Sequence, residues 1–250
     1  MKAAIATRMA TKIIIIVASA FISGLKPNRI LEKINIGKVV DPGPVTKLAI
    51  TKSSSDRQNA KSQPERRPGA RRGRVIALIT LNKPHKKNAL GDILTPALRA
   101  VLPVVEARDD VGCIMITGTG SAFCAGGDVT EMGGSAPAPR SAEERIAELV
   151  KKQKELTGRI YHLRKPTIAA LPGAAAGAGL SIALACDIRI AAESAFVTTA
   201  FKNIGLSGDY GSSWFLPRLI GLARAKTMMY HSARLSAREC KEIGLVDQVY

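Results

Sequence analysis

The chain has 250 residues, of which 46% are hydrophobic and only 4% aromatic, enough for a packed core built mainly from Ala, Ile, Leu and Val. The formal net charge is +17, and residues 1–74 carry most of it, with 16 Lys and Arg against 4 Asp and Glu. The four cysteines are widely spaced without a CxxC pair, which argues against a disulfide framework or a zinc site and for the reduced thiols of an intracellular protein.

The first 73 residues differ from the rest and are interpreted as a basic leader followed by a disordered linker. Lys2, Arg8 and Lys12 precede the apolar run Ile13–Leu25, which Ser and Gly interrupt and which is short for a stable membrane span. A secretory signal, an organelle transit peptide and a start assigned too early all fit this segment. Ser53–Arg74 is polar and basic, so a nucleic-acid-binding arm is an alternative; a solvated tail is favoured because no aromatic residues interleave with the charge.

Strand and helix patterns alternate from residue 74 onward. Val75–Leu81 is an apolar run that predicts a first core strand, and the polar turn Asn82–Asn88 follows it. Helical spacing predicts a helix over Leu90–Ala107, and Gly112–Thr117 predicts the next strand. That strand leads into the small-residue loop Ser121–Asp128, SAFCAGGD.

The second half continues the same alternation. Ser141 followed by Glu144 predicts a capped helix that runs to about Leu163. Pro166–Leu171, Asp187–Ala192 and Ala195–Thr198 predict strands, and the apolar run Leu180–Cys186 predicts a helix. Together these elements indicate an α/β domain with mainly parallel strands, spanning residues 74–250.

Two small-residue loops are the strongest functional signal. Leu171–Asp187, LPGAAAGAGLSIALACD, turns into a helix and therefore directs free backbone N–H groups at one point, where the helix start also favours negative charge. Ser121–Asp128 is a second loop of the same kind, so each loop can supply one donor to the same oxygen. Close packing at a helix start is the alternative explanation for either loop taken alone.

Several stretches, in this order, resemble the enoyl-CoA hydratase/isomerase (crotonase) superfamily. The resemblance runs from about Arg74 to the end of the chain and is more specific for the fold than for the reaction. The matching stretches are Ile79–Leu90, Gly120–Met132, Lys165–Val197, Gly205–Gly221 and Leu235–Val249.

The resemblance implies a spiral of ββα units that assembles as a homotrimer or a hexamer made of two trimers. Members of the family continue into C-terminal helices beyond a piece like the one that ends here at Tyr250. We therefore expect the C-terminal helical part to be missing and the domain 74–250 to be truncated, which puts closure over CoA and the subunit contacts in doubt.

The resemblance also implies a substrate, an acyl-CoA thioester whose carbonyl lies between the backbone N–H groups of Ala125 and Ala178. The reactions of the family pass through an enolate-like oxyanion, which two fixed donors stabilise. Cys124 lies in the first loop, but no base is placed beside it by a motif, so a packing role is favoured over a nucleophilic one. Further residues expected to contact the substrate are Lys86, Lys87, Ala89, Cys124, Gly126, Asp128, Gly177, Tyr210 and Trp214.

The acid/base residues decide the reaction. Hydratases of the family carry two glutamates, and the matching positions here are Ser181 and Phe201, neither of which acts as a carboxylate. Asp209, in the stretch GLSGDYGSSW, matches the aspartate of isomerases in the family that act on ring epoxides or dienoyl groups. One carboxylate can move a proton between the α and γ carbons. Capping of the following helix is the alternative role for Asp209.

These observations predict an enoyl-CoA isomerase, with an enoyl-CoA hydratase as the alternative within the family. A non-catalytic relative, or an RNA-binding protein that uses the basic arm, is the alternative of another class. We expect no metal and no cofactor other than the CoA of the substrate, no binding to nucleic acid and no stable membrane insertion. The expected location is the cytoplasm, or an organelle matrix if the leader is a transit peptide.

Overall fold

The fold comes from a computed structural model, which describes residues 36–40, 46–52, 75–130 and 141–250. The interpretation of residues 1–35 and 53–74 as a leader and a linker falls outside these ranges. No helix within the described ranges is long and apolar enough to cross a membrane.

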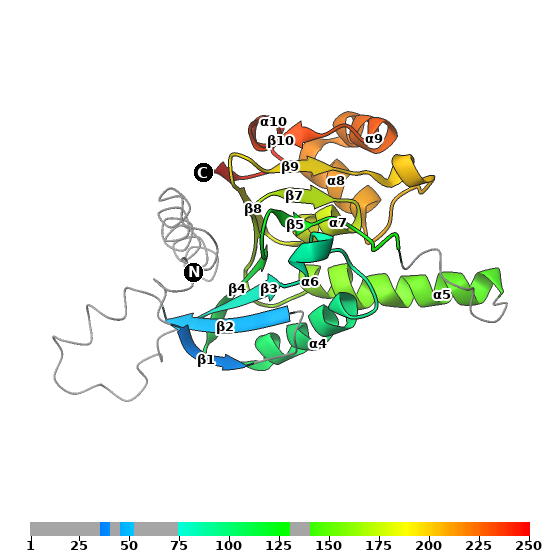
Figure 1. The fold of residues 1–250 in the computed structure, drawn as a ribbon. Coiled ribbons are helices and arrows are strands. Elements are labelled where there is room, and N and C mark those ends of the chain that lie inside the picture. The colour runs from blue at the N-terminus through cyan, green and yellow to red at the C-terminus, as the bar shows by residue number, and fades with distance from the viewer. Residues whose placement is uncertain (1–35, 41–45, 53–74, 131–140) are drawn as a thin grey trace, which may run out of the picture.

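Seven strands form the larger sheet, in the order β1-β2-β3-β4-β6-β8-β11 (Figure 1). The pairs β1–β2 and β2–β3 are antiparallel, and the pairs from β3 to β11 are all parallel. Parallel strands covered on both faces need continuous apolar runs, and β4 and β6 are buried along almost their whole length. The strands are β1 (Ile36–Val40), β2 (Thr46–Lys52), β3 (Val75–Leu81), β4 (Val111–Gly118), β6 (Thr167–Leu171), β8 (Ile188–Ala191) and β11 (Gln248–Val249).

Four short strands form the second sheet, in the order β10-β9-β7-β5. Strands β5, β7 and β9 are parallel, and β10 is antiparallel to β9. Three successive pairs of strands, β4/β5, β6/β7 and β8/β9, each place the first strand in the larger sheet and the second in the smaller one. This repeat is the spiral expected of a crotonase-like α/β fold, which is confirmed. The short strands are β5 (Ala122–Cys124), β7 (Ala174–Ala176), β9 (Phe196–Thr198) and β10 (Leu235–Ser236).

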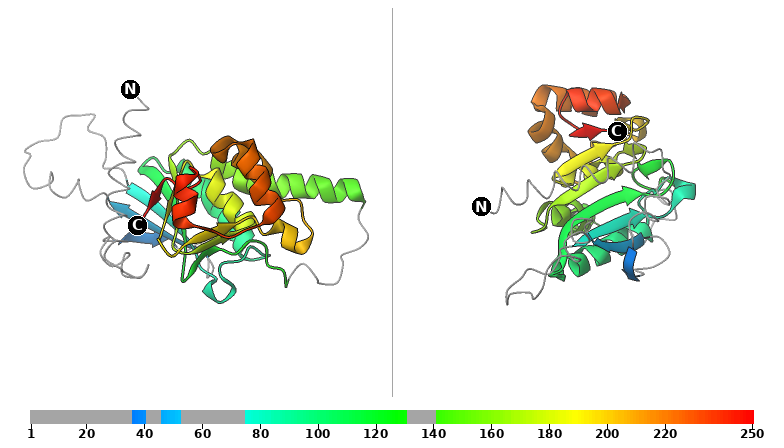
Figure 2. Two further views of the ribbon diagram at one scale, coloured as in Figure 1. Left: turned by 90° about the horizontal axis from the view of Figure 1, so that it is seen from above. Right: turned by 90° about the vertical axis from the view of Figure 1, so that its left-hand side faces the viewer.

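The helices cover the sheets and complete the core. Helix α7 (Ala178–Ala185) is buried at every position, whereas α4 (Leu94–Ala107) buries one face, including Leu98 and Leu102. The last helices, α8 (Ser212–Ile220), α9 (Leu222–His231) and α10 (Ala237–Glu242), gather beside the smaller sheet (Figures 1 and 2). A short 3-10 turn, η1 (Pro84–Lys86), follows β3, and another, η3 (Phe201–Ile204), follows β9.

The helix expected over residues 141–163 is present but is divided. It consists of α5 (Ala142–Gln153), a π-helical turn labelled η2 (Lys154–Gly158) and α6 (Arg159–Tyr161). The Ser141–Glu144 capping box is confirmed at its start. Leu156 and Ile160 are buried, but α5 buries no residue and extends beyond the rest of the molecule (Figure 2).

Two strands lie in a part of the chain for which the sequence predicted none. Strands β1 and β2 belong to residues 1–73, and β2 pairs with β3 from Thr46↔Leu81 to Lys52↔Val75. The sheet therefore begins before the boundary drawn at residue 74. The segment Thr46–Lys52, TKLAITK, is short and carries charged ends, which hid its alternating apolar pattern beside the strongly basic stretch that follows.

Candidate active site

The two small-residue loops meet because β5 and β7 are neighbours in the smaller sheet. Their parallel pairing, Ala122↔Ala174 and Cys124↔Ala175, carries the chain after β5 alongside the start of α7. A Cβ on Gly179 would lie 2.4 Å from the Cys124 carbonyl oxygen, so only glycine permits this approach. A Cβ on Gly126 would lie 3.7 Å from the Ala178 nitrogen. The backbones of the two small-residue loops are thus in direct contact.

Ala178 supplies a free donor from the second loop. It is the first residue of α7, so its N–H has no acceptor inside the helix, and it makes no hydrogen bond elsewhere in the described ranges. Gly177 before it has φ of 50° and donates its own N–H to the Thr198 carbonyl at 3.1 Å. The buried start of α7 therefore directs an N–H group and the positive end of the helix dipole at one point.

Ala125 does not supply the matching donor from the first loop. Its N–H donates to the Lys87 carbonyl at 3.0 Å, which corrects the expectation that this group is free to bind substrate. Gly127 forms a parallel bridge with Leu90, whose N–H donates to Gly126 and whose carbonyl accepts from Asp128. In such a bridge the central residue turns its own N–H away from the partner strand. The Gly127 N–H has no acceptor among the described residues.

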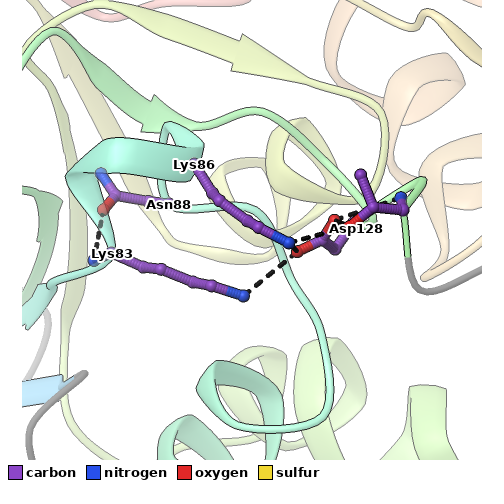
Figure 3. Close-up of polar contacts among 5 residues, drawn as sticks. Lys83, Lys86, Asn88 and Asp128 are labelled. Carbon is purple, nitrogen blue, oxygen red and sulfur yellow. Dashed lines mark hydrogen bonds and ion pairs between the residues drawn. The ribbon is translucent and has the colours of Figure 1, made fainter.

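A buried carboxylate fixes the first loop. One Asp128 oxygen accepts from the Lys83 ammonium at 3.1 Å and from the Lys86 ammonium at 2.8 Å (Figure 3). The bond from Lys86, together with those from Thr130 and Lys83, holds the pKa of Asp128 well below its usual range. No helix follows Asp128 in the described residues up to residue 130, so this side chain anchors the loop by its lysines.

Asn88 is a further anchor that the sequence analysis passed over. It is fully buried; its side-chain oxygen accepts from the Lys83 N–H, and its amide donates to the carbonyls of Thr119 and Ala122. Its φ of 57° is a left-handed value that asparagine tolerates better than most residues, which was the available sequence signal. Of the other residues expected here, Ala89 is buried and the Lys87 side chain is exposed.

Cys124 is a packing residue. Its side chain is fully buried against Gly179, and burial raises the pKa of its thiol to about 12. A thiol held neutral is a poor nucleophile, so a packing role for Cys124 stays favoured over a nucleophilic one. All four cysteines are unpaired.

Asp209 lies in the turn between η3 and α8 and is partly buried. Its Oδ1 atom is inaccessible and has no hydrogen-bond partner among the described residues, and burial raises the pKa of the carboxyl to about 6. Its side chain does not cap α8, whose N-cap is Gly211. A partly buried carboxyl group with a pKa close to neutrality is equipped to take up and release a proton.

Ser181 joins Asp209 to the start of α7. Its hydroxyl is fully buried and donates to the carbonyl oxygens of Asp209, at 3.1 Å, and Gly177, at 3.3 Å. Ser181 is three residues after Ala178, about 4.5 Å along the helix axis. The Asp209 carbonyl therefore contacts α7 about one helical turn after Ala178. Phe201, the second position at which a hydratase would carry glutamate, is buried in η3.

Tyr210 and Trp214, both expected to contact substrate, lie in different surroundings. The Tyr210 hydroxyl accepts from Arg99 of α4 at 3.5 Å, and burial raises its pKa. Trp214 packs edge-on against Tyr161 and Phe215, and the Arg218 guanidinium lies 3.8 Å from its ring centre. Trp214 thus belongs to an aromatic cluster on α6 and α8. No group of three His, Cys, Asp or Glu in the described part of the chain could hold a metal ion.

The fold and these loops define a class of protein, a spiral α/β domain in which two small-residue loops are in contact at the start of a buried helix. Residues 71–250 match the family model described as enoyl-CoA hydratase/isomerase. The chain belongs to the enoyl-CoA hydratase/isomerase family.

Relatives and solved structures agree on the family but differ in the reaction named. The chain is 38% identical to YngF of Bacillus subtilis, over 70% of this chain and 65% of YngF. It is 38% identical to 1,2-epoxyphenylacetyl-CoA isomerase of Escherichia coli, over 70% of this chain and 66% of that protein. It matches the crystal structure of enoyl-CoA hydratase from Bacillus anthracis with a TM-score of 0.64 and 36% identity, over 70% and 66% of the two chains. The chain thus spans slightly less than two thirds of these proteins.

Proposed function

We propose that the chain binds an acyl-CoA thioester and holds the thioester oxygen between the N–H groups of Gly127 and Ala178. Both groups lack acceptors among the described residues, and the loops that carry them are in contact. Donors fixed in advance stabilise an oxyanion more than a neutral carbonyl, and losing one such donor typically costs about 3 kcal/mol of activation free energy.

The proposed reaction is migration of the double bond of an enoyl-CoA, with Asp209 as the acid and base. The Asp209 carboxylate removes a proton from the α carbon of a 3-enoyl thioester, which leaves a dienolate with its charge on the thioester oxygen. The protonated Asp209 then returns that proton to the γ carbon, which gives the 2-enoyl product. The observation that carries this proposal is the buried Oδ1 atom of Asp209, which has no partner among the described residues. It belongs to a residue whose backbone carbonyl accepts from Ser181, about one turn of α7 after Ala178.

Hydration is the second candidate, because the similar solved structure from Bacillus anthracis is that of an enoyl-CoA hydratase. Adding water needs a group that activates the water and one that protonates carbon. Ser181 and Phe201 occupy the two positions at which hydratases of this family carry glutamate, and the Ser181 hydroxyl is already bonded to carbonyl oxygens. Isomerisation, which a single carboxyl group can perform, is therefore the better supported reaction.

The test is product analysis with a 2-enoyl-CoA and a 3-enoyl-CoA, using the wild type, Asp209→Asn and the exposed control Asp109→Asn. Isomerisation predicts interconversion of the two thioesters, a loss of roughly 10²-fold to 10⁴-fold in Asp209→Asn, and normal rates in Asp109→Asn. Because the carboxylate is the base, kcat/KM should also fall below about pH 6. Formation of 3-hydroxyacyl-CoA at the same rate in all three proteins would overturn the isomerase and favour the hydratase.

We further propose that the chain self-associates, as the resemblance to trimeric and hexameric proteins implied. The support is the apolar face that α5 exposes, where Ile146, Leu149 and Val150 are 62%, 44% and 59% accessible. The cofactor and location expected from the sequence stand as part of this proposal: CoA enters with the substrate, and the protein acts in the cytoplasm or an organelle matrix. Sedimentation of the purified chain tests the assembly.

A further inference from the structure

Three buried polar atoms in the described residues lack hydrogen-bond partners, and all three surround one turn. They are Arg99 Nε, Asp209 Oδ1 and Ser212 Oγ. Asp209 belongs to the turn that precedes α8, Ser212 is the first residue of α8, and Arg99 contacts Tyr210 between them. Buried polar atoms nearly always have partners, so three such atoms around one turn indicate groups that a bound molecule completes. The proposed reaction uses Asp209 and leaves Arg99 unexplained.

Arg99 is a partly buried cation without a carboxylate in reach. Its Nη2 donates to the Lys152 carbonyl at 2.9 Å and to the Tyr210 hydroxyl at 3.5 Å, whereas its Nε donates to nothing. No acidic oxygen of the described residues lies within 4.0 Å of the Arg99 guanidinium. By contrast, Arg108, Arg159 and Arg189 form ion pairs with Asp110, Glu106 and Asp247, respectively. A partly buried guanidinium is stabilised by a paired anion, and the planar fork of an arginine suits a carboxylate.

The contacts of Arg99 connect it to the turn that carries Asp209. Contacts lead from Ala178 along α7 to Ser181, from Ser181 to the Asp209 carbonyl, and from Tyr210 to Arg99. The thioester oxygen lies at the first of these points and the reacting carbons beside Asp209 in the proposed reaction. Arg99 therefore lies next to the Asp209 turn, through its contact with Tyr210.

We propose that Arg99, with the Tyr210 hydroxyl, binds a carboxylate at the far end of the acyl group. The preferred substrates are then CoA monothioesters of dicarboxylic acids. This inference rests on the proposed acyl-CoA function and names its substrate class. A purely structural connection from α4 to Lys152 uses Nη2 alone and leaves the buried Nε without a function.

The test compares two saturated thioesters of equal carbon count, glutaryl-CoA and valeryl-CoA, by calorimetric titration of the full chain. They differ in a terminal carboxylate against a terminal methyl group, and neither has a double bond to move. Charged hydrogen bonds contribute about 1.5 to 3 kcal/mol, so the wild type should bind glutaryl-CoA roughly tenfold or more tightly than valeryl-CoA. Arg99→Gln should bring this ratio to about 1, and Arg99→Lys should retain part of it.

Arg224→Gln is the matched control, since it removes one exposed arginine from α9, and it should keep the wild-type ratio. Valeryl-CoA binding by Arg99→Gln reports whether that variant is folded. An unchanged ratio in Arg99→Gln, no preference in the wild type, or no binding of either thioester would each overturn the inference. Turnover of a 3-enoyl-CoA, measured in parallel, separates the two proposals. Normal turnover with equal affinities for glutaryl-CoA and valeryl-CoA overturns only the carboxylate site. A preference for glutaryl-CoA without turnover of the 3-enoyl-CoA overturns only the isomerase.

Discussion

The loop after β5 and the turn before α8 form two sides of the same site and differ in how their polar groups are satisfied. In the first, the Ala125 N–H and the Asp128 carboxylate have partners in the segment Lys83–Asn88, which also holds the Ala122 carbonyl of β5. In the second, Asp209 has a buried polar atom without a partner among the described residues, and so does Ser212 at the start of α8. In the proposed reaction this contrast separates two tasks, since donors must be held rigid before the substrate arrives, whereas the Asp209 carboxyl group must be free to exchange a proton.

This difference has a consequence for stability. Hydrogen bonds and ion pairs made in the folded state stabilise the first loop, whereas an unpaired buried carboxyl group lowers the stability of the fold when it is charged. Destabilised groups of this kind are found at functional sites, where they are maintained by the rest of the structure. Substitutions in the two regions should therefore change the free energy of unfolding by different amounts and in different directions.

The largest effect is expected from Gly179→Ala, which breaks the contact that holds the first loop on α7. The added Cβ would lie 2.4 Å from the Cys124 carbonyl oxygen, a backbone atom that cannot move without moving β5. The free energy of unfolding should fall by about 3 kcal/mol, as measured by urea denaturation. Gly158→Ala is the control in η2, where the nearest neighbour would be an ordinary 3.6 Å away, and it should be neutral. Equal losses in the two variants would contradict the close contact.

Asp209→Asn and Asp128→Asn should change the free energy of unfolding in opposite directions at pH 7. Burial raises the pKa of Asp209 to about 6 from its ordinary 3.8, so the folded state holds this proton more tightly than the unfolded one. Its stabilising contribution is complete below about pH 4 and is lost as the pH rises through about 6. Asp209→Asn should therefore raise the free energy of unfolding at pH 7 by about 2 kcal/mol, allowing for its partial contact with water.

Asp128→Asn should instead destabilise the fold at pH 7. Its lysines lower the pKa of Asp128, so its contribution is present above the ordinary carboxyl pKa and is lost only in strong acid. Unfolding curves of both variants at pH 7 and pH 4 provide the measurement. The gain from Asp209→Asn should disappear at pH 4, and most of the loss from Asp128→Asn should remain. If both variants changed the free energy of unfolding in the same direction at pH 7, the proposed difference between the loop after β5 and the Asp209 turn would be contradicted.

The sequence predicted the fold well because its signals are local. Val75–Leu81 is a strand with the predicted bounds, and β4 and β6 agree with their predictions within one residue, because long apolar runs end at polar or glycine-rich turns. The capping box at Ser141 was equally visible. The π-turn η2 was missed because it interrupts the helix without changing its apolar spacing enough to be noticed.

The site was predicted less completely because its details depend on contacts between distant residues. The loop Ser121–Asp128 was identified, but which N–H is free depends on the bond from Ala125 to Lys87 and on the bridge at Gly127. The Lys83–Asp128 pair joins residues 45 positions apart, and no spacing rule indicates it. Arg99 lay within a predicted helix without any motif, and only its contact with Tyr210 relates it to the site.

The smallest effect is expected from Ser181→Ala, which removes the contact between α7 and the Asp209 turn and leaves the Asp209 carboxyl group unchanged. The variant loses the bond from the hydroxyl to the Asp209 carbonyl, and an ordinary buried hydrogen bond contributes about 1 kcal/mol to stability. Ser181 acts on the reaction through Asp209, so the rate should fall through kcat while KM for the thioester stays close to the wild-type value.

Thr227→Ala is the control for this change, because its exposed hydroxyl also donates to a backbone carbonyl four residues earlier, at 3.1 Å. The pH profile distinguishes positioning from simple stability. Displacing the Asp209 turn toward solvent would relieve its burial, so the pKa seen in kcat/KM should move down from about 6 in Ser181→Ala and stay in place in Thr227→Ala. An unchanged profile with reduced stability would mean that Ser181 holds the helix but does not set the environment of the carboxyl group, and that the turn keeps its unsatisfied state without this contact.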